Sequence, residues 1–206
     1  MLILVGRTCS GKDKIARELI NMGYKKIVSY TTRPIRDEEK DGVDYKFILE
    51  NEFLKLKEQG YFAETTSYNV EKGETWHYGI SIQDLKNATK DTIVILNPEG
   101  LRQVKEIIGA DVIDFYIEVQ DEIIKERLKE RGDNPKEAKR RLKADKKDFK
   151  GIENETNYII SNNYPETFER TVHQIDYIYK KHMQLKQLKR KFESNYKKGI
   201  INESNK

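Results

Sequence analysis

The sequence has one cysteine, three histidines and no long apolar run. A single cysteine, Cys9, excludes an internal disulfide and suits a reducing cytosol. The histidines are scattered along the chain, and no Cys/His set has the spacing of a zinc site. No apolar run approaches the roughly 18 residues of a membrane-spanning helix, and no signal peptide is recognisable. We therefore expect a cytoplasmic protein without a membrane partner.

Positive and negative residues nearly balance in number. The 39 Lys and Arg residues against 35 Asp and Glu give a net charge of +4, which does not indicate a specific nucleic acid partner. The basic residues concentrate after residue 180, where Leu185, Leu188 and Phe192 recur at helical spacing. This pattern predicts a basic helical extension over residues 181–206. The alternative is a solvated helix or a fraying terminus without a role.

The most specific pattern lies near the N-terminus, where an apolar run at residues 2–5 leads into glycines and a lysine. The spacing of Gly6, Gly11 and Lys12 matches a phosphate-binding loop. Glycines let successive N–H groups point inward, the following helix adds its positive end, and the lysine bridges the outer phosphates. An ordinary glycine-containing turn is the alternative. We expect the ATP phosphates to bind at Gly6, Arg7, Thr8, Cys9, Ser10, Gly11, Lys12 and Asp13.

The residue after the lysine departs from the usual loop. A Ser or Thr hydroxyl normally ligates Mg²⁺ at this position, and here the residue is Asp13. A carboxylate can also bind Mg²⁺, a hard cation that prefers oxygen. Without the metal, however, the carboxylate would repel the triphosphate. We therefore expect Mg²⁺ as the cofactor and Asp13 as its protein ligand.

A second group of phosphate-binding residue types begins at residue 29. Arg33 and Arg36 can each give a forked, charge-assisted pair to a phosphate, and the hydroxyls of Tyr45 and Tyr78 can add neutral donors. Two phosphate sites on one chain favour transfer of a phosphoryl group between two bound molecules. The alternatives are a solvated charged loop for the arginines and ordinary strand packing for the tyrosines.

Several motifs, in order and at compatible spacing, make the chain similar to the guanylate kinases from about residue 2 to about residue 180. Ser-x-Thr-Thr-Arg-x-x-Arg stands at residues 29–36, and Asp-Gly-x-Asp-Tyr-x-Phe follows at residues 41–47. A glutamate after aromatic residues comes next, at Glu64, and then the pair Tyr78 and Gly79. The resemblance implies a P-loop nucleoside monophosphate kinase that uses ATP and Mg²⁺.

By this resemblance the acceptor site reads guanine. The Glu64 carboxylate would accept the guanine N1–H and N2 amino group, and Ser29 would touch the O6 edge. Two positions differ from the family, because Asn97 replaces an acidic residue and Ile80 replaces a serine. The stretch from Glu64 to Tyr78 is longer than usual, which suggests an extended hairpin tip. The expected acceptor residues are Ser29, Arg33, Arg36, Tyr45, Glu64, Tyr78 and Asn97.

Residues 120–142 read as helix, turn and helix, and they resemble the family's lid. The resemblance assigns catalytic roles to Arg131 and Arg141, alongside Lys12 in the phosphate loop. Arginines that swing in on closure would neutralise the charge that spreads over the transferring phosphoryl group. The alternative is a solvated helix face, since these arginines lie among many Lys and Glu residues.

Alternating strands and helices predict an α/β fold, with strands near residues 2–5, 26–30, 92–96, 112–118 and 157–160. We expect a three-layer P-loop core with a parallel sheet, an inserted β-rich lobe and a helical lid. The expected guanylate kinase-like domain covers residues 1–180, followed by the tail at 181–206. Within the domain, the core is 1–28, 81–120 and 151–180, the nucleoside monophosphate-binding lobe is 29–80, and the lid is 121–150.

The sequence thus favours an enzyme that phosphorylates a nucleoside monophosphate, GMP or dGMP, with ATP. Two alternatives stay open. A non-catalytic module of the same fold would hold phosphorylated ligands in the acceptor site, and a related kinase would use another nucleotide or a sugar phosphate. The expected partners are the small-molecule nucleotides, and the expected assembly is a monomer or a homodimer.

Overall fold

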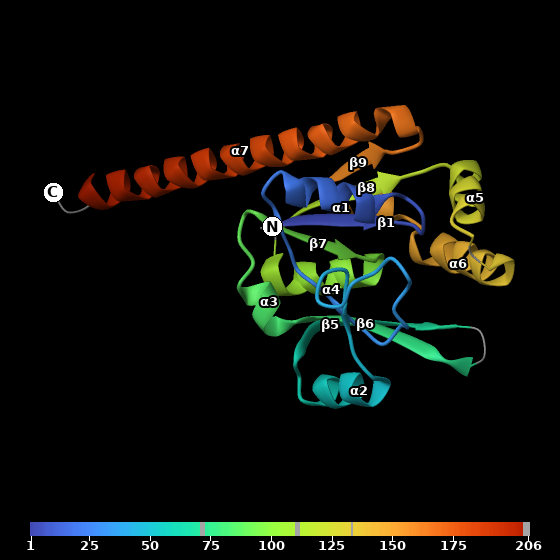
Figure 1. Ribbon diagram of the computed structural model, residues 1–206. Coiled ribbons are helices and arrows are strands. Elements are labelled where there is room, and N and C mark those ends of the chain that lie inside the picture. Colours follow the sequence, from blue (N-terminus) through green and yellow to red (C-terminus); the bar gives the residue numbers. More distant parts are fainter. Residues whose placement is uncertain (71–72, 110–111, 133, 204–206) are drawn as a thin grey trace.

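The computed structural model describes residues 1–70, 73–109, 112–132 and 134–203, with side chains up to residue 193 (Figure 1). Parts of three predicted features lie outside the described residues. These are Glu71 and Lys72 in the hairpin tip, Asp133 in the lid turn, and residues 204–206 of the tail.

A five-stranded parallel sheet forms the core, in the order β2-β7-β1-β8-β9. Its central strand is the apolar N-terminal run, in which Leu2 lies opposite Ile93 on one side and Ile113 on the other. A parallel sheet is covered on both faces, so an uninterrupted apolar run fits its centre. The strands are β1 (Leu2–Gly6), β2 (Lys25–Lys26), β7 (Thr92–Leu96), β8 (Ile113–Glu118) and β9 (Tyr158–Ser161).

Helices cover both faces of this sheet and complete three layers (Figure 1). One face packs Leu2 and Leu4 against α1 (Lys12–Asn21) and α7 (Phe168–Glu203). The other face packs Ile3 and Val5 against α4 (Pro98–Ile108), with α3 (Ile82–Lys86) alongside. The predicted α/β class and layered core are confirmed.

A separate four-stranded sheet, in the order β4-β3-β6-β5, lies below the core in Figure 1. Its strands are β3 (Tyr30–Thr31), β4 (Lys46–Phe47), β5 (Phe62–Asn69) and β6 (Thr75–Ser81), and α2 (Glu50–Glu58) packs beside it. The predicted single strand near residues 26–30 was wrong. The chain makes two short strands there, and they belong to different sheets: β2 to the core sheet and β3 to the small sheet.

Two further helices, α5 (Asp121–Glu130) and α6 (Pro135–Asp148), occupy the segment predicted as the lid. The 3₁₀ turns η3 (Ile152–Asn154) and η4 (Pro165–Thr167) flank β9. Helix α7 is continuous across residue 180, where the sequence suggested that a tail begins, and its far end projects from the domain (Figure 1). Among the described residues, no helix is both long and apolar enough to span a bilayer.

Candidate active site

The phosphate loop joins β1 to α1, and its two glycines stand where a side chain does not fit. Gly11 forms the N-cap of α1 at φ 88°. A Cβ on Gly6 would lie 2.5 Å from Ser10 Oγ, and one on Gly11 would collide with Asn162 Nδ2. Cys9 also adopts positive φ, at 54°, so the loop is tightly wound.

The loop carbonyls are held by protein donors, and the loop's helix end is left without a side-chain cap. Arg127 Nη1 donates to the Cys9 carbonyl at 3.2 Å, and Asn162 Nδ2 donates to the Ser10 carbonyl at 2.8 Å. Among the described residues, no side-chain hydrogen bond caps the N-terminus of α1, where Lys12 and Asp13 stand in the first turn. An uncapped helix start presents N–H groups and the positive end of the helix dipole, which together suit an anion.

The lid segment contacts this loop through side chains that the sequence did not single out. Asp145 Oδ2 on α6 accepts the Thr8 N–H at 2.7 Å. Arg7 Nη1 donates to Asp121 Oδ1 at 2.5 Å, and Lys146 Nζ lies 3.5 Å from the other oxygen of the same carboxylate. Burial raises the pKa of the Asp145 carboxyl, although the Thr8 bond and the charges of Lys12 and Arg7 oppose it. The lid helix therefore lies directly against the phosphate loop.

Arg33 is buried and bound by a carboxylate of its own loop. Its Nη2 donates to both oxygens of Glu39, at 2.7 and 2.9 Å, and its Nη1 donates to the Pro34 carbonyl at 2.7 Å. The Arg36 N–H also donates to Glu39, at 3.0 Å. The Arg33 guanidinium lies 5.5 Å from the ring centroid of Tyr45. Arg33 is thus neither a solvated loop residue nor an empty phosphate clamp, because Glu39 binds its Nη2 and the Pro34 carbonyl binds its Nη1.

Arg36 lies in an excess of positive charge that comes from two distant parts of the chain. Burial lowers the pKa of Arg36, and the charges of Arg33, Arg141 and Arg131 lower it further. Arg141 Nε donates to Glu137 Oε1 at 2.8 Å, which holds this lid arginine on α6. The folded chain therefore brings together the arginines predicted for the acceptor segment and those predicted for the lid.

Three tyrosines connect the arginines to Glu64 and Asn97, the positions predicted to read the base. The ring centroids of Tyr45 and Tyr78 are 5.9 Å apart, and those of Tyr78 and Tyr68 are 5.8 Å apart. The Tyr68 hydroxyl accepts a hydrogen bond from Asn97 Nδ2, while Asn97 Oδ1 caps α4 by accepting the Gly100 N–H at 2.7 Å. Asn97 thus already uses its oxygen and one of its amide donors within the protein.

Glu64 lies beside Asn97, with an oxygen that has no partner. Its Oε2 is buried without a hydrogen bond among the described residues. Both this oxygen and Asn97 Oδ1 lie close to the position of a Cβ on Gly100, at 2.9 and 3.2 Å. Burial raises the pKa of Glu64 to about 7, and the charge of Glu99 adds to the effect. A buried carboxyl lacking donors of its own is suited to accept donors from a ligand.

Two further positions bear on the acceptor site, namely Ser29, which was expected in it, and Ile80, where the sequence departs from the family. Ser29 precedes β3, and its carbonyl accepts the Lys46 N–H at 2.9 Å. Within the described part of the chain, the Ser29 hydroxyl makes no hydrogen bond to Glu64. Ile80 lies opposite Glu64 in the β5–β6 register and is fully buried in the core, packed with residues such as Leu101. Ile80 therefore supports the sheet and offers no polar group to a ligand.

A sequence comparison decides the family. Residues 1–182 match the family described as guanylate kinase. This chain belongs to the guanylate kinase family. The guanylate kinase of Malacoplasma penetrans is 32% identical over 171 residues, which cover 79% of this chain and 84% of that protein. The guanylate kinase of Nitrosomonas europaea is 28% identical over 178 residues, or 84% of this chain and 86% of that protein.

A structural comparison agrees with this guanylate kinase assignment. The crystal structure of guanylate kinase from Anaplasma phagocytophilum superposes with a TM-score of 0.67 at 27% identity, covering 88% of this chain and 85% of that one. The resemblance inferred from the motifs is therefore confirmed, and so is the fold that it implied.

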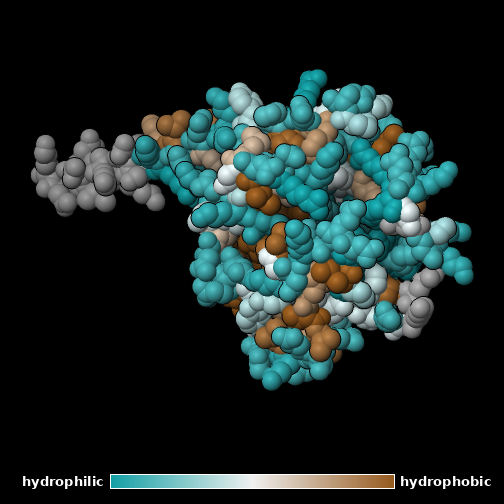
Figure 2. Space-filling view, in the orientation of Figure 1, coloured by the Kyte–Doolittle hydropathy of each residue, from teal (hydrophilic) through white to brown (hydrophobic). Residues whose placement is uncertain are grey.

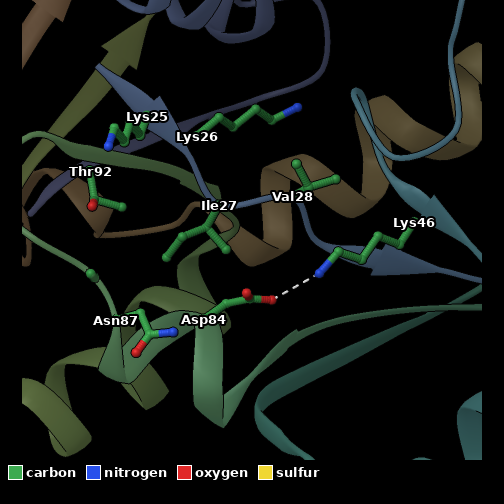
Figure 3. A pocket seen from close by; sticks show the side chains of 9 residues that line it. Lys25, Lys26, Ile27, Val28, Lys46, Asp84, Asn87 and Thr92 are labelled. Carbon is green, nitrogen blue, oxygen red and sulfur yellow. Dashed lines mark hydrogen bonds and ion pairs between the residues drawn. The ribbon is translucent and has the colours of Figure 1, made fainter. Parts of the chain in front are cut away.

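The cavity in Figure 3 lies apart from these residues. Its volume is about 220 Å³, and it lies where β2 and α3 of the core meet the small sheet. Lys46 Nζ lies 3.0 Å from Asp84 Oδ2, and Lys26 Nζ donates to the Asp44 carbonyl at 2.8 Å, while Lys25 also lines the cavity. No predicted site residue lines it, so we assign the chemistry to the phosphate loop and its surroundings.

Some site residues could have been found from the sequence by their periodicity. Tyr68 follows Glu64 by four positions along a strand, so both side chains point to the same face. Asp145 follows Arg141 by four positions along a helix, which also places them on one face. Glu39 gave no comparable signal, because it stands in a loop rich in charges of both signs.

Proposed function

We propose that this member of the guanylate kinase family transfers the γ-phosphoryl group of ATP to a nucleoside monophosphate, GMP or dGMP, giving ADP and the nucleoside diphosphate. The observation that supports it is the position of Arg36, whose pKa is lowered by burial and then by the charges of Arg33, Arg141 and Arg131, although Glu39 opposes them. The Arg36 side chain is 44% exposed, so water screens part of this repulsion, and a bound polyanion would offset the rest. Two phosphorylated molecules bound at their phosphate ends would supply that anion.

In this proposal each segment holds one part of the reacting pair. The start of α1 and Lys12 bind the ATP phosphates. Arg36, Tyr45 and Tyr78 fix the acceptor phosphate. Arg33 helps to bind the acceptor phosphate, either by contacting it or by holding Glu39, whose carboxylate keeps the loop folded around Arg36. Arg131 and Arg141 neutralise the charge that develops on the transferring group.

The reaction itself needs no general base. An oxygen of the acceptor phosphate is already ionised, and it attacks the γ-phosphorus in line with the bond to the β–γ bridging oxygen. That bond breaks as the new one forms, and the bridging oxygen leaves with ADP. Positioning and electrostatic stabilisation therefore supply the rate acceleration, and closure of the lid excludes water.

Mg²⁺ is compatible with the residues around the loop. The Asp13 carboxylate is exposed in the first turn of α1, next to Lys12, and Mg²⁺ in such sites takes one or two carboxylates plus substrate phosphates. The ion would supply charge neutralisation at the ATP phosphates. Asp13 would hold it there, while Lys12 keeps its direct contact with the phosphates.

Guanine is the proposed acceptor base because Glu64 offers a buried acceptor without a partner. A coupled assay of ADP release across GMP, dGMP, AMP, CMP and UMP tests the proposal. We expect turnover with GMP and dGMP and much less with the others. No ADP release with any acceptor, together with binding of phosphorylated peptides, would favour a non-catalytic module. Turnover with another acceptor alone would assign a different phosphotransferase.

A further inference from the structure

Helix α7 carries an exposed apolar stripe that nothing in the described part of the chain covers. The stripe consists of Tyr177, Leu185, Leu188 and Phe192, which are 63%, 66%, 62% and 74% exposed. Leu185, Leu188 and Phe192 follow one another at intervals of three and four residues, so they share one face of the helix. Four large apolar side chains on one helix face exceed the scattered single exposures that a surface normally shows.

The stripe faces away from the domain. Val172, Ile175 and Tyr179 of the same helix are buried against the core sheet and α1. Ile175 and Tyr177 are two residues apart, which turns them about 200° from each other around the helix axis. Because the helix is straight and its far half projects from the domain (Figure 1), a flat surface can contact the stripe without meeting the core.

The charge around the stripe has one sign. Arg170, Lys181, Lys189 and Lys191 are exposed, and Lys181 Nζ lies 5.8 Å from the ring centroid of Tyr177. Asp176 is the only acidic residue between positions 170 and 192. Asp176 is buried, where it accepts the Tyr24 hydroxyl at 2.8 Å and pairs with Lys180 at 2.9 Å. Between positions 170 and 192, no exposed carboxylate in the described part of the chain therefore offsets the basic side chains, and the nearest acidic residues on the helix are Glu169 and Glu193. Figure 2 shows apolar and hydrophilic surface side by side on α7 where it leaves the domain.

We propose that α7 docks on the surface of an anionic lipid bilayer, with the stripe in the interface and the basic residues against the headgroups. An interfacial helix combines Leu, Phe or Trp on one face with Lys and Arg around it, and this is the pattern of α7. A nucleic acid would use the basic residues and leave the stripe in water. A second copy of α7 would cover the stripe but bring two basic helices together. The inference concerns a surface contact, whereas the sequence led us to expect no membrane partner.

Sedimentation of the full chain with vesicles tests this proposal. Vesicles of phosphatidylcholine alone are compared with vesicles of phosphatidylcholine and phosphatidylglycerol in equal parts. We expect the bound fraction relative to free protein to be at least about tenfold higher on the anionic vesicles, and to fall as salt is raised. The triple variant Leu185→Gln, Leu188→Gln and Phe192→Gln should lose about tenfold of this binding.

A matched variant separates the stripe from exposed apolar residues in general. Leu54→Gln, Ile107→Gln and Ile159→Gln also remove three exposed apolar side chains, at 42%, 57% and 46% exposure, but none lies on α7. This control should bind the anionic vesicles as the unaltered chain does. Far-ultraviolet circular dichroism checks that α7 stays helical in both variants. Since the stripe lies outside the phosphate-binding segments, both variants should keep the same ADP release, whatever acceptor the enzyme uses.

Several results would overturn the proposal. Equal binding to neutral and anionic vesicles, or no binding to either, would show that α7 does not recognise an anionic bilayer. If both triple variants lose the same amount of vesicle binding, the stripe has no specific role in it. A dimer in light scattering that the stripe variant abolishes would show that a second copy covers the stripe. Binding to a DNA or RNA duplex that depends on Lys181, Lys189 and Lys191 but not on Leu188 would assign a nucleic acid instead.

Discussion

If Glu64 binds guanine as proposed, its raised pKa makes GMP binding sensitive to pH. Guanine offers two N–H donors, so only the carboxylate form of Glu64 can accept both. Because burial raises the pKa from 4.5 to about 7, the carboxylate is the major form above pH 7 and a minor form below it. We expect GMP affinity to be highest above pH 7 and to fall about tenfold per pH unit well below it.

Glu64→Gln provides the reference for this experiment. The acceptor phosphate also titrates, with a second pKa near 6, and it does so equally for both proteins. The ratio of wild-type to variant GMP affinity, measured by calorimetry between pH 5.5 and about 8.5, should therefore report Glu64 alone. The variant should also discriminate less between GMP and AMP, because its amide opposes one guanine donor with an N–H₂ group.

The same pKa shift predicts a change in stability with the opposite pH dependence. The folded protein holds the Glu64 proton more tightly than the unfolded chain. Its contribution to the free energy of unfolding is therefore full below pH 4.5 and is lost as the pH rises through about 7. A shift of this size corresponds to about 3 kcal/mol. In urea unfolding, the wild type should lose up to that amount relative to Glu64→Gln between pH 4 and about 8.

The reasoning fails if Glu64→Gln has the wild-type pH profile and the wild-type preference for GMP. A wild-type enzyme that uses AMP as well as GMP would also end the guanine assignment, and would leave a phosphotransferase with another acceptor. Because Ile80 offers no polar group and Asn97 Oδ1 already accepts the Gly100 N–H, we expect discrimination in the wild type to depend mainly on Glu64.

Three further predictions concern the phosphate sites and the base site. Lys12→Ala should lower kcat at least about a hundredfold with the fold intact, since it removes a charge aimed at the transferring group; a near-normal rate would refute the phosphate-loop assignment. Arg36→Ala should weaken acceptor binding by about 1.5–3 kcal/mol and ATP binding much less, whereas Arg33→Ala should also lower the denaturation midpoint, because Glu39 loses its partner. Equal effects of both arginine variants on ATP and on the acceptor would place these residues elsewhere. Tyr68→Phe should raise the KM for GMP several-fold while kcat is kept, because it removes the hydroxyl that holds the Asn97 amide beside Glu64; an unchanged KM would show that Tyr68 only packs.

Local spacing was sufficient to predict most strands, and it also predicted the phosphate loop, whose binding role stays a prediction. The glycines and Lys12 lie within seven consecutive residues, and β7 begins and ends where its apolar run does. Such elements depend on backbone conformation and burial pattern over a few positions, which the sequence shows directly. The prediction of one strand at residues 26–30 was wrong, because spacing does not show which of two sheets a short segment joins.

The chemistry of the acceptor site needed the tertiary structure. The Glu39 carboxylate in the fork of Arg33, the Tyr68 hydroxyl on Asn97, and the raised pKa of Glu64 all arise from side chains that meet only after folding. Burial sets that pKa, and burial is a property of the packed molecule and not of the residue type.

The sequence by itself determined the fold class and the family, and it predicted which residue types would bind phosphate, because these follow from short motifs and their order. The tertiary structure decided how the two halves of the site meet. Asp145 accepts the N–H of Thr8, although 137 residues separate them in the sequence. The charges of Arg131 and Arg141 add to the effect of burial in lowering the pKa of Arg36, which is far from both in the sequence. Contacts between such distant segments depend on how sheet, lobe and lid pack, and no local spacing encodes that arrangement.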